Sequence, residues 1–151
     1  MRRLFIMRKD LNMSPGKLAA QVSHCAEAYW TNMMRRTAKS VYDPTHLIGD
    51  EKVEGYAFSF TVPAEEYEEY INGSFVKTIC EAKNKNHLLK AREKALELGL
   101  VEGDDFGLIR DNCLTELEPE DEDGRTLTGI WFKPLPDDVS RMISKKYQLY
   151  K

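Results

Sequence analysis

A short apolar run followed directly by an amphipathic helical pattern constrains the fold of this chain more than any other feature. The run at residues 4–7 predicts a strand over about 3–8. Ser14 is the expected N-cap of the helix that follows, and Pro15 suits its first turn because no backbone N–H is needed there. The helix extends over about 15–38, with an apolar face formed by Leu18, Val22, Cys25 and Tyr29. This pattern predicts a helix that docks on a core by one side.

A second face of this helix carries polar groups. Lys17, Gln21 and His24 lie at i, i+4 and i+7, which places them in one narrow stripe. The helix dipole disfavours a cation in the first turn by a few tenths of a kcal/mol, up to about 1. An anionic ligand would offset this cost for Lys17, because free N–H groups and the lysine direct positive charge at one spot. A solvated surface lysine is the alternative, and spacing alone slightly favours it.

Length and cysteine content favour a single domain in a reducing compartment. The 151 residues are enough for one domain that buries roughly two thirds of its unfolded surface. Cys25, Cys80 and Cys113 are widely spaced and odd in number, which argues against a disulfide framework and a zinc site. The first apolar run is too short for a signal peptide, and no segment approaches a membrane span. We therefore expect a cytoplasmic protein.

The net charge of −3 conceals an uneven distribution. Residues 1–46 carry eight basic and three acidic side chains, and residues 83–94 carry five basic and one acidic. Residues 102–124 carry ten acidic side chains and one arginine. Such separation can steer a polyanion towards one face of a protein. Ordinary solvated surfaces are the alternative interpretation.

The rest of the chain alternates between strand and helix patterns. A loop is expected at 40–55, a strand at 56–62 and a helix from Pro63 to about 73. Further strands are expected at 75–81, 106–110 and 126–132, with helices at 85–98 and from Pro136 onwards. An acidic turn at 118–124 joins the last two strands as a hairpin. These elements predict an α/β sandwich with a mixed sheet.

Several common catalytic signatures are missing from the chain. It has no G-x-x-x-x-G-K-[ST], G-x-G-x-x-G, H-E-x-x-H or G-x-S-x-G motif. The chain therefore lacks the usual sequence evidence for a nucleotide-binding protein, a dinucleotide-binding protein, a zinc protease or a serine hydrolase. Cys25 follows His24, but adjacent helical residues point about 100° apart. Cys25 is therefore expected in the core.

Three segments carry a resemblance to a known family. RKDLNMSPGKLAAQVSH at 8–24 resembles the signature of the second-type peptidyl-tRNA hydrolases, which are typical of archaea and eukaryotes. LIRDNCLTELEP at 108–119 is similar to a second motif of that family. The third match is the expected strand at 126–132, followed by Pro134 and a terminal helix. The resemblance covers residues 1–30 and about 75–151.

This resemblance implies a fold and an activity. The family has a three-layer α/β/α sandwich around a mixed four-stranded sheet and is often dimeric. It cleaves the ester between a peptide and the terminal ribose of tRNA without a metal or cofactor. The positions that match its site are Lys17, Gln21, Asp111 and Thr115, with Asp10, Ser23 and His24 as supporting candidates.

Ester hydrolysis needs an activated water and donors for the developing oxyanion. We hypothesise that Asp111 orients or deprotonates the water, that Gln21 and Thr115 donate to substrate, and that Lys17 offsets charge or holds a phosphate. For three of these residues a purely structural interpretation stays open. His24 is equally well read as a structural histidine, Asp10 as a turn residue, and Thr115 as a strand residue.

A tRNA substrate would also need phosphate contacts beside the site. The candidates are Arg35, Arg36, Lys39, Lys83 and Lys85. The chain departs from the family pattern at Lys9, where threonine is usual, at Cys113, where glycine is usual, at 131–134, and in a longer segment at 40–74. Two alternatives to the enzyme are a catalytically weak tRNA- or RNA-end-binding module and an interaction subunit whose acidic turn binds a basic partner.

Overall fold

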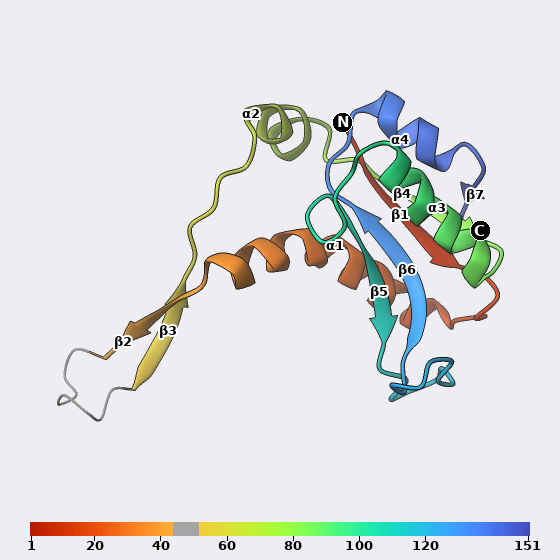
Figure 1. Cartoon of the computed structure of the whole chain (residues 1–151), viewed down its shortest axis with the longest axis horizontal. Coiled ribbons are helices and arrows are strands. Elements are labelled where there is room, and N and C mark those ends of the chain that lie inside the picture. Colours follow the sequence, from red (N-terminus) through yellow and green to blue (C-terminus); the bar gives the residue numbers. More distant parts are fainter. Residues whose placement is uncertain (44–51) are drawn as a thin grey trace.

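A mixed five-stranded sheet organises the protein (Figure 1). The computed structural model describes residues 1–43 and 52–151. The strand order is β5 (Phe106–Asp111), β6 (Thr126–Phe132), β1 (Arg3–Arg8), β4 (Lys77–Ala82) and β7 (Gln148–Leu149). β1 and β4 are parallel, and the other neighbouring pairs are antiparallel. The expected hairpin of β5 and β6 is confirmed, as is the α/β class.

Helices cover both faces of this sheet (Figure 1). α1 (Pro15–Thr37) packs on one face, and α3 (Lys85–Glu97) and α4 (Asp137–Ser144) pack on the other. The central strand β1 serves both layers, because its side chains alternate between the two faces. Leu4 and Ile6 belong to the core under α3 and α4, whereas Phe5 and Met7 belong to the core under α1. The three-layer sandwich follows from this alternation.

The start of α1 follows the sequence pattern. Ser14 is the N-cap, and its Oγ accepts a hydrogen bond of 3.2 Å from the backbone N–H of Lys17. Cys25 and Tyr29 are buried on the face that meets the sheet. Cys25 therefore lies in the core, as predicted.

The segment after α1 differs from the expectation. A separate two-stranded sheet, β2 (Lys39–Tyr42) with β3 (Val53–Ala57), occupies most of the described part of the expected loop at 40–55. Residues 44–51 of that loop lie outside the described residues. The expected strand at 56–62 is wrong beyond Ala57, because residues 58–63 pair with no strand within 1–43 and 52–151. Alternating apolar residues alone do not make a strand.

Other boundaries shift by a few residues. The helix expected from Pro63 begins as α2 (Ala64–Glu66) and continues as a wider π-helical stretch, η1 (Tyr67–Ser74). The sheet has five strands where the resemblance implies four, because the two-residue β7 pairs with β4. No helix within residues 1–43 and 52–151 has the length and hydropathy to cross a membrane.

Candidate active site

The carboxylate of Asp111 joins α1 to the end of β5. Its Oδ1 accepts hydrogen bonds from Lys17 Nζ at 2.8 Å and from Gln21 Nε2 at 3.0 Å. Lys17 and Gln21 lie one turn apart near the start of α1, and Asp111 is the last residue of β5. Two segments that lie far apart in the sequence therefore meet at one oxygen atom.

Lys17 also reaches the loop that follows β5. Its Nζ donates to Thr115 Oγ1 at 3.0 Å. The side chains of Lys17 and Asp111 are 11% and 10% exposed, so the ion pair is largely enclosed but still open to a ligand. The helix dipole disfavours the positive charge of Lys17, and the carboxylate of Asp111 offsets this cost within the protein. The sequence pattern suggests an external anion in this role.

Gln21 is held from two sides. It is 1% exposed, and its Oε1 accepts a 2.7 Å hydrogen bond from Thr128 Oγ1 on β6. Because the hydroxyl of Thr128 donates to Oε1, the other end of the amide, Nε2, faces Asp111. Sequence reasoning missed Thr128. The available signal was a hydroxyl residue in the middle of an apolar strand, where burial demands a partner.

The turn after Asp111 fixes the second carboxylate oxygen. Asp111 Oδ2 accepts from the backbone N–H of Cys113 at 3.0 Å. Cys113 has a φ of 57°, in the left-handed region that favours glycine. This is the position where the resembled family usually has glycine. This chain thus keeps the left-handed backbone conformation that glycine adopts easily, and Cys113 bears the strain.

A carboxylate clamp ties the same loop to the start of α1. Glu116 accepts from the backbone N–H of Ser14 at 2.9 Å and from its Oγ at 2.5 Å. These hydrogen bonds hold the pKa of Glu116 below its ordinary value. Because Ser14 also caps α1, the clamp fixes Lys17 and Thr115 relative to each other.

The supporting candidates do not contact Asp111 in the part of the chain that the structure describes. Asp10 instead pairs with the buried Arg8, at 2.7 Å between Oδ2 and Nη2. Ser23 donates to the backbone carbonyl of Ala19 at 2.9 Å. His24 is exposed and lines a hollow beside β5. The structure thus brings together four of the seven candidates, namely Lys17, Gln21, Asp111 and Thr115.

Many of the basic candidates are already paired. Arg36 binds Asp104 and the carbonyl of Gly103, and Lys85 Nζ lies 2.8 Å from Asp121 Oδ1. Arg35 donates to side chains of its own helix. Lys39 lies on the exposed strand β2. The basic and acidic blocks therefore neutralise one another in part, and the charge separation is smaller than the sequence suggests.

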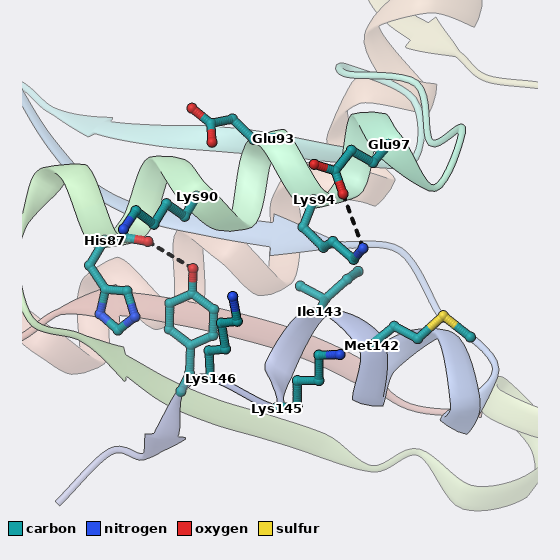
Figure 2. A pocket seen from close by; sticks show the side chains of 10 residues that line it. His87, Lys90, Glu93, Lys94, Glu97, Met142, Ile143, Lys145 and Lys146 are labelled. Carbon is teal, nitrogen blue, oxygen red and sulfur yellow. Dashed lines mark hydrogen bonds and ion pairs between the residues drawn. The ribbon is translucent and has the colours of Figure 1, made fainter.

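Lys83 lies among further lysines between α3 and the end of α4. It lines a hollow together with His87, Lys145 and Lys146. An adjoining hollow between the helices adds Lys90 and Lys94, with Glu93 and Glu97 on the same wall (Figure 2). Tyr147 donates to the carbonyl of His87 at 2.7 Å and stacks on its ring, which joins the two walls.

Lys9, another departure from the family pattern, points away from Asp111. Its Nζ lies 4.3 Å from the centre of the Tyr150 ring and 3.7 Å from Glu81. Within the described residues, no three His, Cys, Asp or Glu side chains are grouped as metal ligands.

The sequence of this chain is similar to known proteins over almost its whole length. The family model of peptidyl-tRNA hydrolase PTH2 matches residues 1–150. A peptidyl-tRNA hydrolase of Sulfolobus acidocaldarius is 27% identical over 139 residues, which cover 92% of this chain and 91% of that protein. The solved structure of a protein of unknown function from Agrobacterium tumefaciens aligns over 99% of this chain and 97% of that one, at a TM-score of 0.46 and 10% identity. The family match over nearly the whole length shows that the chain belongs to the PTH2 family of peptidyl-tRNA hydrolases.

Proposed function

We propose that Lys17, Gln21, Asp111 and Thr115 form the catalytic centre of this peptidyl-tRNA hydrolase. The bond cleaved is the ester between a peptide, or an N-blocked amino acid, and the 3′-terminal ribose of tRNA. The observation that carries this proposal is the shared Asp111 carboxylate, which takes hydrogen bonds from Lys17 at 2.8 Å and Gln21 at 3.0 Å.

Asp111 acts on the water. A carboxylate has about four lone-pair sites, and three donors already occupy sites on Asp111. The remaining site orients a water molecule and accepts its proton as the water oxygen attacks the ester carbonyl. When the tetrahedral intermediate collapses, the ribose oxygen leaves and takes up that proton. General-base assistance of this kind contributes about 10²–10⁴-fold to a rate.

Lys17 and Thr115 stabilise the oxyanion. The ammonium of Lys17 lies between Asp111 and Thr115, so it supplies positive charge beside the attacked carbonyl. Because Thr115 Oγ1 accepts from Lys17, its own O–H is free to donate to the substrate. No step of this scheme requires a metal ion. We therefore expect hydrolysis to persist after treatment with a chelator.

Gln21 positions Asp111 in this scheme. It is almost fully buried, so its amide reaches the carboxylate more readily than a bound substrate. Loss of this hydrogen bond would let the carboxylate rotate away from the water.

The tRNA body would bind through basic side chains around the site. We propose phosphate contacts for Arg35, Arg36, Lys39, Lys83 and Lys85. Lys83 is supported by the lysines that share its hollow, whereas Arg36 and Lys85 must exchange an acidic partner for a phosphate. Affinity for tRNA should fall steeply as salt rises, and a flat salt dependence would contradict this part of the proposal.

The protein is proposed to act in the cytoplasm as a homodimer. Cys25 and Cys80 are buried free thiols and Cys113 is a partly exposed one, which suits a reducing compartment.

A catalytically weak tRNA-end-binding module is the second candidate. The strained backbone at Cys113 favours it, because this residue supports the second oxygen of Asp111. The third reading, an interaction subunit with a free acidic turn, loses support because Glu120 and Asp121 are held by Arg8, Lys85 and Arg110.

Release of an N-blocked amino acid from tRNA separates the first two candidates. Wild type, Lys17→Ala and Asp111→Ala are compared with Lys94→Ala as the control, whose lysine lies on α3 and pairs with Glu97. The enzyme predicts release by wild type and the control, and little by the two site variants. Retained tRNA binding without release by wild type would favour the module. Equal release by all four proteins would refute the proposed centre.

A further inference from the structure

The β2–β3 hairpin forms an arm that lies away from the main sheet (Figure 1). Its two strands pair with each other and are exposed along nearly their whole length. The arm leaves the body at the end of α1 and returns at α2, where the buried Glu66 accepts a 2.7 Å hydrogen bond from Tyr29. An isolated two-stranded hairpin is marginally stable in water. Another surface must therefore support this arm.

One face of the arm is apolar and aromatic. Tyr42 pairs with Val53 and Ser40 pairs with Tyr56, and cross-strand partners share a face. Tyr42 and Tyr56 are 50% and 61% exposed. Phe58 and Phe60, in the segment that follows, are 49% and 36% exposed. Several large apolar side chains exposed within one short segment indicate an interaction site.

The charge of the arm argues against RNA as its partner. Its described residues, 39–43 and 52–57, contain two lysines and two acidic residues, so they carry no excess of positive charge. Phosphate binding needs an excess of basic side chains. A protein surface with apolar walls fits this arm better.

The chain itself offers such a surface beside the first half of α1. A groove of about 520 Å³ has apolar walls formed by Pro15, Leu18, Ala19, Val22, Ile79 and Tyr150. The adjoining hollow shares Pro15, Leu18 and Tyr150 and adds Lys9 and Lys151.

The geometry of α1 lets two copies exchange these surfaces. The groove lies at the start of α1 and the arm at its end, and a helix of 23 residues is about 34 Å long. In a two-fold dimer with antiparallel α1 helices, the arm of each copy meets the groove of the other. The two arm–groove contacts of such a dimer are identical by symmetry, so the assembly stops at two copies.

The available area matches a stable dimer. A full aromatic side chain buries about 200 Å². The exposed fractions of Tyr42, Tyr56, Phe58 and Phe60 thus leave roughly 400 Å² of aromatic surface on each arm. Two arms and the surfaces that cover them would bury about 1,600 Å² in total, which is the standard size of a specific interface.

We propose that the described residues of the arm and of the segment after it, 39–43 and 52–60, dock into the α1 groove of a second copy of this chain. This proposal rests on the homodimer named under the proposed function and supplies its interface. It does not depend on hydrolysis.

The test measures mass in solution by light scattering for three proteins. The arm variant is Tyr42→Ser with Tyr56→Ser, the groove variant is Ala19→Arg, and Val101→Ser is a matched control at another exposed apolar residue. All changed side chains are exposed, so folding should persist. Wild type and the control should have about twice the monomer mass of 17.4 kDa, and the arm and groove variants should each be monomeric.

Mixing the two monomeric variants provides the decisive measurement. Each supplies the surface that the other lacks, so the mixture should recover part of the dimer through one intact contact. A monomeric wild type, a dimeric arm variant, a groove variant that still dimerises, or a mixture that stays monomeric would each overturn the proposal. Peptide release by wild type, measured in parallel, tests hydrolysis separately: an active monomer refutes only the interface, and an inactive dimer only the hydrolase.

Discussion

Lys17 Nζ lies 2.8 Å from Asp111 Oδ1 although 94 residues separate them in the chain. Their ion pair lies where the start of α1 meets the end of β5. Neither element alone would bring these two side chains together. The site is thus a product of the packing of α1 against the β5–β6 hairpin.

Lys17 and Asp111 should behave as one unit in catalysis. Lys17→Met and Asp111→Asn are each expected to lower the rate of hydrolysis by about 10²–10⁴-fold. The double variant should be little slower than either single variant, because each change removes the same arrangement. Single-turnover rates for the three proteins check this. Losses that multiply would show that the two side chains act independently.

Thr128 should set the orientation of Gln21. Thr128→Val removes the donor to Gln21 Oε1 and leaves a buried acceptor unpaired, at a cost of about 1–3 kcal/mol. The rate of hydrolysis should fall while the KM for tRNA stays close to that of wild type, because Thr128 contacts Gln21 and not the substrate. Thr128→Ser keeps the hydroxyl and is the matched control. Equal rate losses in both variants would contradict a role for the hydrogen bond.

Cys113→Gly should stabilise the fold. The left-handed backbone at φ 57° costs a non-glycine residue about 1–2 kcal/mol, and the added freedom of glycine in the unfolded chain offsets part of the gain. We expect a net gain of up to about 1 kcal/mol, or roughly 2–4 °C in Tm. Cys113→Ala removes the thiol but keeps the strain, so it should give no gain. A Tm that rises equally in both variants would point to the thiol instead.

The sequence predicted the elements that local pattern determines. The N-cap at Ser14, the buried face of α1 and the β5–β6 hairpin all depend on residues close in the chain. The strand expected at 56–62 is wrong beyond Ala57, because Phe58 and Phe60 alternate correctly but pair with no strand among the described residues. Pairing partners cannot be read from one segment alone.

The features of the site that sequence analysis missed depend on contacts between residues far apart in the chain. Thr128 reaches Gln21 only because of the position of β6 beneath α1. The pairing of Arg36 with Asp104 and of Lys85 with Asp121 likewise joins segments far apart in the chain. Counting charges along the sequence therefore overstated the separation of basic and acidic surfaces.

Glu120 should make stability depend on pH. Arg8, which is buried, donates to Glu120 at 2.5 Å and 2.9 Å and holds the pKa of this carboxyl below its ordinary value. A lowered folded-state pKa contributes stability above the unfolded pKa, and the contribution is lost as pH falls through the folded value. Wild type should thus exceed Glu120→Gln by about 1–2 kcal/mol at pH 7.

Urea unfolding of both proteins between pH 7 and pH 3 checks this expectation. The difference should begin to shrink as the pH falls below the ordinary pKa of glutamate, and it should vanish below the lowered pKa of folded Glu120, where both proteins carry a neutral side chain at this position. Glu118→Gln is the matched control, since this exposed residue lies outside the ion pairs of Arg8. A difference between wild type and Glu120→Gln that persists unchanged at pH 3 would assign the effect to packing and not to the charge on Glu120.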